Sequence, residues 1–199
     1  NYCYEDKWKD LLTPEIVGLL TSIHELKGEQ RLFIEAHRDE LAELVEVAKI
    51  QSTEASNRIE GIFTSEDRLR NLVLEKTTPH GRNESEIAGY RDVLNTIHQS
   101  YEFIPVTPNY LLQLHRDLYK FSGSGDGGRF KTADNVIQEI DTDGKERIRF
   151  RPVPAWETPD ALEKLCQAYK KVQNEGSVDM LIVNAMFILD FLCIHPYND

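Results

Sequence analysis

Apolar side chains recur every three or four residues along most of the chain, which is the spacing of an amphipathic helix. This spacing predicts helices over residues 14–27, 29–50, 64–75, 84–100, 107–121, 158–174 and 177–194. A further short helix is expected between residues 51 and 60, because Gly61 is suited to end a helix. Residues 177–194 are apolar on nearly every side, so this last helix is expected at the buried centre of the fold.

One stretch interrupts the helical pattern. Residues 122–131 (SGSGDGGRFK) contain too much glycine for a helix. Residues 135–153 then alternate between polar and apolar positions and carry Asp143-Gly144 near their middle, which predicts a β-hairpin. The sequence therefore predicts a mainly α fold with one hairpin, organised as an N-terminal helical region over 1–80 and a core over 81–199.

The composition argues against several classes of function. The chain has 34 acidic and 23 basic residues, with a formal net charge of −11, so it lacks the broad basic face that binds nucleic acid. No apolar run is long enough to span a membrane, and no membrane partner is expected. The three cysteines are too scattered for a zinc site and fit a reducing, cytoplasmic location. The six histidines form no HxxxH or HExxH pair, which disfavours a metal-dependent hydrolase.

The segment IHPYND, residues 194–199, places reactive groups directly after the predicted central helix. Pro196 ends the helix and fixes the turn. His195 is the side chain best suited to accept a proton near neutral pH, and Asp199 offers a hard oxygen ligand for Mg²⁺. A base and a metal ligand on one loop would suit attack on a phosphate. The alternative is a histidine that only caps the end of the helix.

These residues resemble the first part of the Fic motif, HPFx(D/E)GNGR. Tyr197 stands where the family usually has Phe, and Phe191 matches the aromatic residue that precedes the motif. The predicted hairpin, about residues 133–151, occupies the place of the family's flap. A second segment, SNRIEG from Ser56 to Gly61, resembles the family's inhibitory motif (S/T)xxxE(G/N). The resemblance implies a Fic-type helical core with one β-hairpin flap, preceded by an N-terminal helical extension that carries the inhibitory motif.

The resemblance also implies an activity, that of a protein adenylyltransferase. Such an enzyme transfers AMP from ATP to a Ser, Thr or Tyr hydroxyl of a target protein. His195 would be the general base, and Asp199 would hold Mg²⁺ at the phosphates. The flap, including Asn135, Val136 and Ile137, would pair with an extended segment of the target. The alternative for the same segment is a plain surface hairpin with no binding role.

The inhibitory motif gives Glu60 a separate role by resemblance. In the family this glutamate forms a salt bridge with the second arginine beyond the GNG of the motif, and ATP then binds in a non-productive pose. Ser56 and Gly61 would be the other fixed members of the motif. In some relatives the same glutamate serves the removal of AMP. Taken alone, Glu60 would be interpreted as a solvated acid at a helix end.

The chain departs from the family pattern after Asp199, because the expected GNGR is absent. We therefore expect the chain as given to be truncated inside the motif and inactive by itself, with the activity belonging to a full-length parent. Two alternatives stay open. One is a non-catalytic Fic-like module that binds proteins, and the other is a family member that transfers another phosphate-containing group. A second copy of the chain is a further candidate partner.

Overall fold

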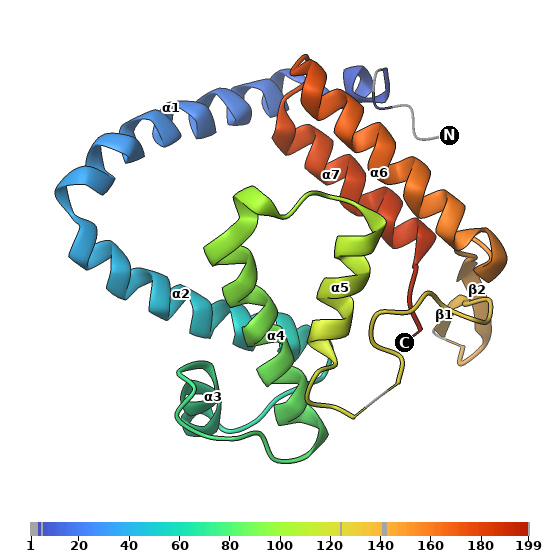
Figure 1. Ribbon diagram of the computed structural model, residues 1–199. Coiled ribbons are helices and arrows are strands. Elements are labelled where there is room, and N and C mark those ends of the chain that lie inside the picture. Colours follow the sequence, from blue (N-terminus) through green and yellow to red (C-terminus); the bar gives the residue numbers. More distant parts are fainter. Residues whose placement is uncertain (1–3, 5, 124, 141–142, 199) are drawn as a thin grey trace. The chain divides into compact units, whose positions relative to one another are not determined.

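The computed structural model describes residues 4, 6–123, 125–140 and 143–198, without the side chains at 31, 32, 35, 36, 38, 39 and 42 (Figure 1). These residues form seven α-helices and one antiparallel hairpin, so the predicted fold class is confirmed. The elements are η1 (Lys7–Leu11), α1 (Pro14–Ala36), α2 (Arg38–Ile59), α3 (Glu66–Val73), α4 (Gly81–Ser100), η2 (Tyr101–Phe103), α5 (Pro108–Leu118), β1 (Ile137–Ile140), β2 (Glu146–Phe150), η3 (Ala155–Glu157), α6 (Thr158–Glu175) and α7 (Met180–Ile194).

Contacts along the chain divide it into two compact units. We call the first the motif unit; it consists of Asn1–Asp10, Pro105–Gln113 and Gly128–Asp199. The second, the helical unit, consists of Leu11–Ile104 and Leu114–Gly127. This division follows packing alone, so the functional boundary between 1–80 and 81–199 stays a prediction.

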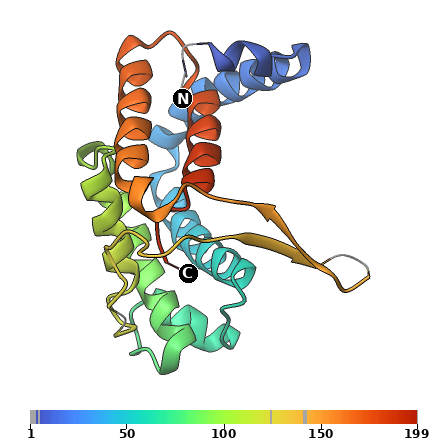
Figure 2. The same ribbon diagram turned by 90° about the vertical axis from the view of Figure 1, so that its right-hand side faces the viewer.

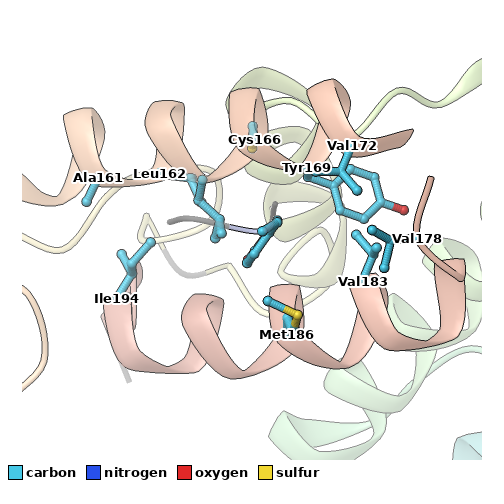
Figure 3. Packing of buried hydrophobic residues seen from close by; sticks show 11 residues of the cluster. Ala161, Leu162, Cys166, Tyr169, Val172, Val178, Val183, Met186 and Ile194 are labelled. Carbon is cyan, nitrogen blue, oxygen red and sulfur yellow. The ribbon is translucent and has the colours of Figure 1, made fainter. Parts of the chain in front are cut away.

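The motif unit is built on α6 and α7, which lie side by side (Figures 1 and 2). A proline at the second position of α6 is tolerated because the first turn of a helix needs no donor there. Gly176 ends α6 in the left-handed conformation with φ +62°, and the Asp179 carboxylate accepts the Leu181 N–H at 2.9 Å to begin α7. Figure 3 shows the apolar side chains of the two helices facing each other; they include Leu162, Cys166, Tyr169, Val172, Val183, Met186 and Ile194.

Helix α7 is buried on one side only, so the prediction that it lies wholly inside the fold is wrong. Val183 and Ile194 are fully buried, whereas Leu189 is 63% exposed. The other large apolar residues of α7 that are exposed are Leu181, Ile188 and Leu192. An apolar composition shows which side chains can be buried, but the neighbouring elements decide which of them are. Across the described part of the chain, no helix combines the length and apolarity needed to cross a membrane.

In the helical unit, two predicted helix boundaries are corrected. Helix α1 continues through Gly28 and ends at His37, whose φ of −130° and ψ of +40° break the helical path. One glycine in a helix costs only about 1 kcal/mol relative to alanine, so it need not end the helix. Helix α2 then runs without interruption through residues 51–59, where a separate short helix was expected. Gly61 has a φ of +73°, which confirms its predicted place just past a helix end.

The hairpin pairs β1 with β2 in antiparallel register, which confirms the predicted hairpin. Gln138 faces Ile148 and Ile140 faces Glu146, with an irregularity between Ile137 and Gln138. Every residue of β2 is exposed. The hairpin extends away from α6 and α7 (Figure 2). It is therefore a projecting element and contributes little to the core.

Candidate active site

His195 ends α7 and begins the loop HPYN, which we call the His-Pro loop (residues 195–198). Its backbone lies in the left-handed region, with φ +48° and ψ +70°, a conformation that residues other than glycine adopt rarely. Its N–H donates to the carbonyl oxygen of Phe191 at 2.9 Å, and Pro196 stops the helix from continuing. The general-base hypothesis and the helix-cap alternative both fit this position.

Lys131 holds the carbonyl groups on either side of His195. Its ammonium Nζ donates to the Ile194 carbonyl oxygen at 2.9 Å, and its backbone N–H donates to the Pro196 carbonyl oxygen at 2.9 Å. The residue is only 3% exposed. A cation at the C-terminal end of a helix is favourable because the carbonyl groups there carry partial negative charge.

Two further contacts extend this attachment along the His-Pro loop. The Thr132 N–H donates to Asn198 Oδ1 at 3.3 Å, and Asn135 Nδ2 donates to the Tyr197 carbonyl oxygen at 3.4 Å. Residues 131–135, which we call the anchor segment, therefore bond to the loop at several points. Asn135 is predicted to bind the target, but in the structure its side-chain amide donates to the His-Pro loop.

The segment that follows the hairpin is attached to the same helix end. The Val153 N–H donates to the Cys193 carbonyl oxygen at 3.3 Å. Asp134, which precedes the hairpin, accepts the N–H of Ala155, which follows it, at 2.7 Å. The base of the hairpin is thus closed on itself and fixed to the C-terminal end of α7.

Tyr197 packs as an aromatic residue inside the loop. Its ring meets that of Phe191 edge-on, with centroids 6.0 Å apart. Burial raises the pKa of Tyr197 to about 12, and the neighbouring Cys166 adds to the shift. The phenol therefore stays neutral at physiological pH. A tyrosine at this position can do the packing of the phenylalanine that the motif usually has there.

The hairpin leaves backbone groups available for pairing. Within the described residues β1 pairs with β2 alone, so each strand has one open edge. Val136 and Ile137, predicted as target-binding residues, are each 41% exposed. An exposed edge of this kind can accept an extended peptide as a third strand.

The predicted inhibitory residues lie in the helical unit, at the end of α2. Ser56 accepts a hydrogen bond of 2.9 Å from the Tyr90 hydroxyl on α4. Glu60 is the exposed C-cap residue of α2, and its N–H donates to the Asn57 carbonyl oxygen at 3.1 Å. Gly61 follows in the left-handed conformation. The backbone that presents Glu60 is therefore well defined.

Asp199, the predicted metal ligand, lies outside the described residues. Among the residues that are described, no three His, Cys, Asp or Glu side chains gather into a metal site. A Mg²⁺ ion bound with a nucleotide needs only one or two protein carboxylates, because phosphates and water complete its coordination. One carboxylate from the protein would therefore be enough, and the assignment of Asp199 stays a prediction.

Sequence patterns do not single out Lys131. Its local context, GGRFKTADN, shows only a glycine-rich stretch before a hairpin. The residue that it holds, Ile194, is 63 positions away in the sequence. In the sequence, Lys131 is a single lysine between a glycine-rich loop and a strand, and such a lysine is usually exposed.

The described geometry defines a class of protein, a helical domain in which a histidine-proline loop is fixed to the base of a β-hairpin. Comparison with known families names it: residues 105–199 match the model of the Fic/DOC family. The predicted resemblance to the Fic family is therefore confirmed for this part of the chain.

Solved structures show the same fold. The chain is similar to a Fic domain containing signaling protein from Bacteroides thetaiotaomicron, with 19% identity over 81% of this chain and a TM-score of 0.69. It is also similar to a Fic family protein from Desulfovibrio desulfuricans, with 20% identity over 94% of this chain and a TM-score of 0.74. The chain spans 60% and 54% of those two proteins. No curated protein matches it.

Proposed function

We propose that the full-length protein transfers AMP from ATP to a Ser, Thr or Tyr hydroxyl of a target protein. The observation that carries this proposal is the His-Pro loop fixed to the base of the hairpin, within residues that match the Fic/DOC family. The loop supplies a base, and the hairpin supplies an edge for the target.

His195 is the proposed general base. It takes the proton of the target hydroxyl while that oxygen attacks the α-phosphorus of ATP and the bond to pyrophosphate breaks. Pyrophosphate leaves, the AMP remains on the target oxygen, and His195 returns its proton to solvent. Asp199 would hold Mg²⁺, which supplies neutralisation of the phosphate charge when bound.

The open edge of the hairpin is the proposed site for the target. Backbone hydrogen bonds to β1 would align an extended segment with little demand on its sequence. The hairpin base is fixed to the end of α7, so a segment on this edge would keep a constant relation to His195. This arrangement would present a hydroxyl to the base in a reproducible orientation.

Glu60 is the proposed inhibitor. Its carboxylate would occupy the arginine that otherwise holds the γ-phosphate of ATP. Its exposure and its place at the end of α2 support this role, because the group is accessible and its backbone N–H is bonded to the Asn57 carbonyl oxygen.

The test is transfer of label from radiolabelled ATP to the full-length protein or its target. Glu60→Gly should raise incorporation roughly tenfold, as expected for the loss of an inhibitory coupling of about 1.4 kcal/mol. Glu66→Gln is the matched control, because Glu66 is another exposed acid close by in the sequence; it should leave incorporation unchanged. Equal incorporation by wild type and Glu60→Gly would contradict the inhibitory role.

The same assay separates the open alternatives. Label supplied only in the γ-phosphate, or in another nucleotide, would reveal transfer of a different group. Loss of AMP from a modified target would show the reverse reaction. A protein that captures a target but transfers nothing from any of these donors would be a binding module.

A further inference from the structure

Lys131 is a buried cation in a position that the proposed chemistry does not use. Charged side chains are rarely this buried, because removing them from water is unfavourable unless polar groups compensate. Here the compensation is visible: the ammonium donates to the Ile194 carbonyl oxygen at the end of α7. The energetic cost of burying this lysine makes a plain space-filling role a poor explanation.

The contacts of Lys131 straddle His195. The peptide group between Ile194 and His195 is held at both ends, since its carbonyl oxygen accepts from Lys131 Nζ and its N–H donates to the Phe191 carbonyl oxygen. The carbonyl group of the following residue, Pro196, accepts from the Lys131 backbone N–H. Rotation about the His195 backbone would break at least one of these bonds.

We infer that Lys131 is a positioning residue that keeps His195 in its left-handed conformation, an inference that rests on the proposed role of His195 as general base. The left-handed region is unfavourable for a residue with a side chain. A conformation of this kind persists only where surrounding bonds determine it. Lys131 supplies two of those bonds, one from its side chain and one from its backbone.

The side-chain bond is the part that substitution can remove. Lys131→Met keeps the length and the apolar stem of the side chain but removes the charge and the donor. The Ile194 carbonyl group then loses this donor in a buried place, and the peptide group before His195 keeps only the bond from its N–H to the Phe191 carbonyl oxygen. The effect on catalysis should be positional, because a base displaced by about 1 Å can lose on the order of a hundredfold in rate.

The first measurement is steady-state AMP transfer by the full-length protein in a Glu60→Gly background. Lys131→Met should lower kcat on the order of a hundredfold and leave KM for ATP nearly unchanged. Lys170→Met is the control, because Lys170 is an exposed lysine on α6 of the same unit. A folded Lys131→Met variant with the parent kcat would overturn the inference, since a merely structural role lowers stability and not the rate per folded molecule.

The second measurement does not depend on activity. Amide hydrogen exchange at His195, followed by NMR, should be at least about tenfold faster in Lys131→Met than in Lys170→Met, because the local opening becomes easier. Equal protection in the two variants would overturn the inference. If Lys131→Met does not fold, Lys131→Arg takes its place. Arginine keeps the charge, but its planar guanidinium group cannot reproduce the hydrogen bond of the compact ammonium group. This variant should lower kcat while the protection of other core amides is retained.

A further variant separates this inference from the proposed function. His195→Ala in the same background should abolish transfer. If it does not, the general-base proposal fails, while the exchange measurement still decides whether Lys131 fixes the loop.

Discussion

At the scale of single residues, Glu84 joins separate parts of the helical unit. Its carboxylate accepts from Arg68 Nε at 2.9 Å, from the Thr64 hydroxyl at 3.1 Å and from the His80 N–H at 2.8 Å. The hydrogen bond with Arg68 is the main reason why the pKa of Glu84 falls to about 2, against the opposing effect of burial. Helix α4 is thereby tied to α3 and to the loop between them.

The first stability prediction concerns this carboxylate. Glu84→Gln should lower the free energy of unfolding by about 2 kcal/mol at pH 7, because a charged acceptor is replaced by a neutral group. The folded-state pKa lies below the ordinary value of 4.5, so the stabilisation is present above pH 4.5 and is lost as the pH falls toward 2. Urea unfolding should therefore show the two proteins converging in acid. A stability difference that does not change with pH would contradict the assigned ionisation.

Features encoded by neighbouring residues could be predicted from the sequence, whereas bonds between distant residues could not. Gly61 and His195 were found because a helix end has a signature in the adjacent sequence. The bonds of Lys131 to Ile194 and of Tyr90 to Ser56 join residues 63 and 34 positions apart. A pattern within one window of sequence carries no information about such pairs.

At the scale of elements, α4 and α5 approach each other closely at Gly89. A Cβ atom added to this glycine would lie 1.9 Å from the Leu118 carbonyl oxygen, which belongs to backbone and cannot move aside easily. Gly18 in α1 provides the opposite case, since nothing lies within 4 Å of an added Cβ. A substitution at Gly89 therefore tests the packing of two helices, whereas one at Gly18 tests helix propensity alone.

The second stability prediction uses this pair. Gly89→Ala should lower the free energy of unfolding by about 1–3 kcal/mol, because the helices must separate to admit the methyl group. Gly18→Ala should raise it by up to about 1 kcal/mol, since alanine favours the helix. Thermal unfolding of the two variants checks both signs. Similar midpoints would show that α4 and α5 are not in close contact.

The buried side of helix α7 could not be predicted from the sequence. Its existence and its end at His195 follow from the run of apolar residues and from Pro196. The side that is buried does not follow, because the helix is apolar on nearly every side and offers no polar face to orient it. Val183 is buried because it packs in the core shared with α6, whereas Leu189 lies on the exposed side of the helix.

The third stability prediction tests that distinction. Leu162→Ala in α6 should cost about 2–5 kcal/mol, because it opens a cavity in the core shared with α7. Leu189→Ala on the exposed side should change the free energy of unfolding by less than about 0.5 kcal/mol. Chemical denaturation of the isolated chain measures both. A large loss for Leu189→Ala would mean that this side is covered in solution.

At the scale of the whole molecule, the fold likeness extends beyond the segment that matches the family model. That model covers residues 105–199, whereas the solved Fic family protein from Desulfovibrio desulfuricans covers 94% of the chain. The N-terminal helices are therefore part of the shared fold, as the predicted helical extension requires. The motif residues and the order of the elements made this fold predictable, while the attachment of the loop to the hairpin base became visible only in three dimensions.

Intact-mass spectrometry can show whether His195 is needed for AMP transfer. The full-length Glu60→Gly protein would be incubated with ATP and Mg²⁺, with and without the further substitution His195→Ala. We expect a mass increase of one AMP group per modified hydroxyl when His195 is present, and none when it is replaced. The same adduct in both proteins, or no adduct in either, would contradict it.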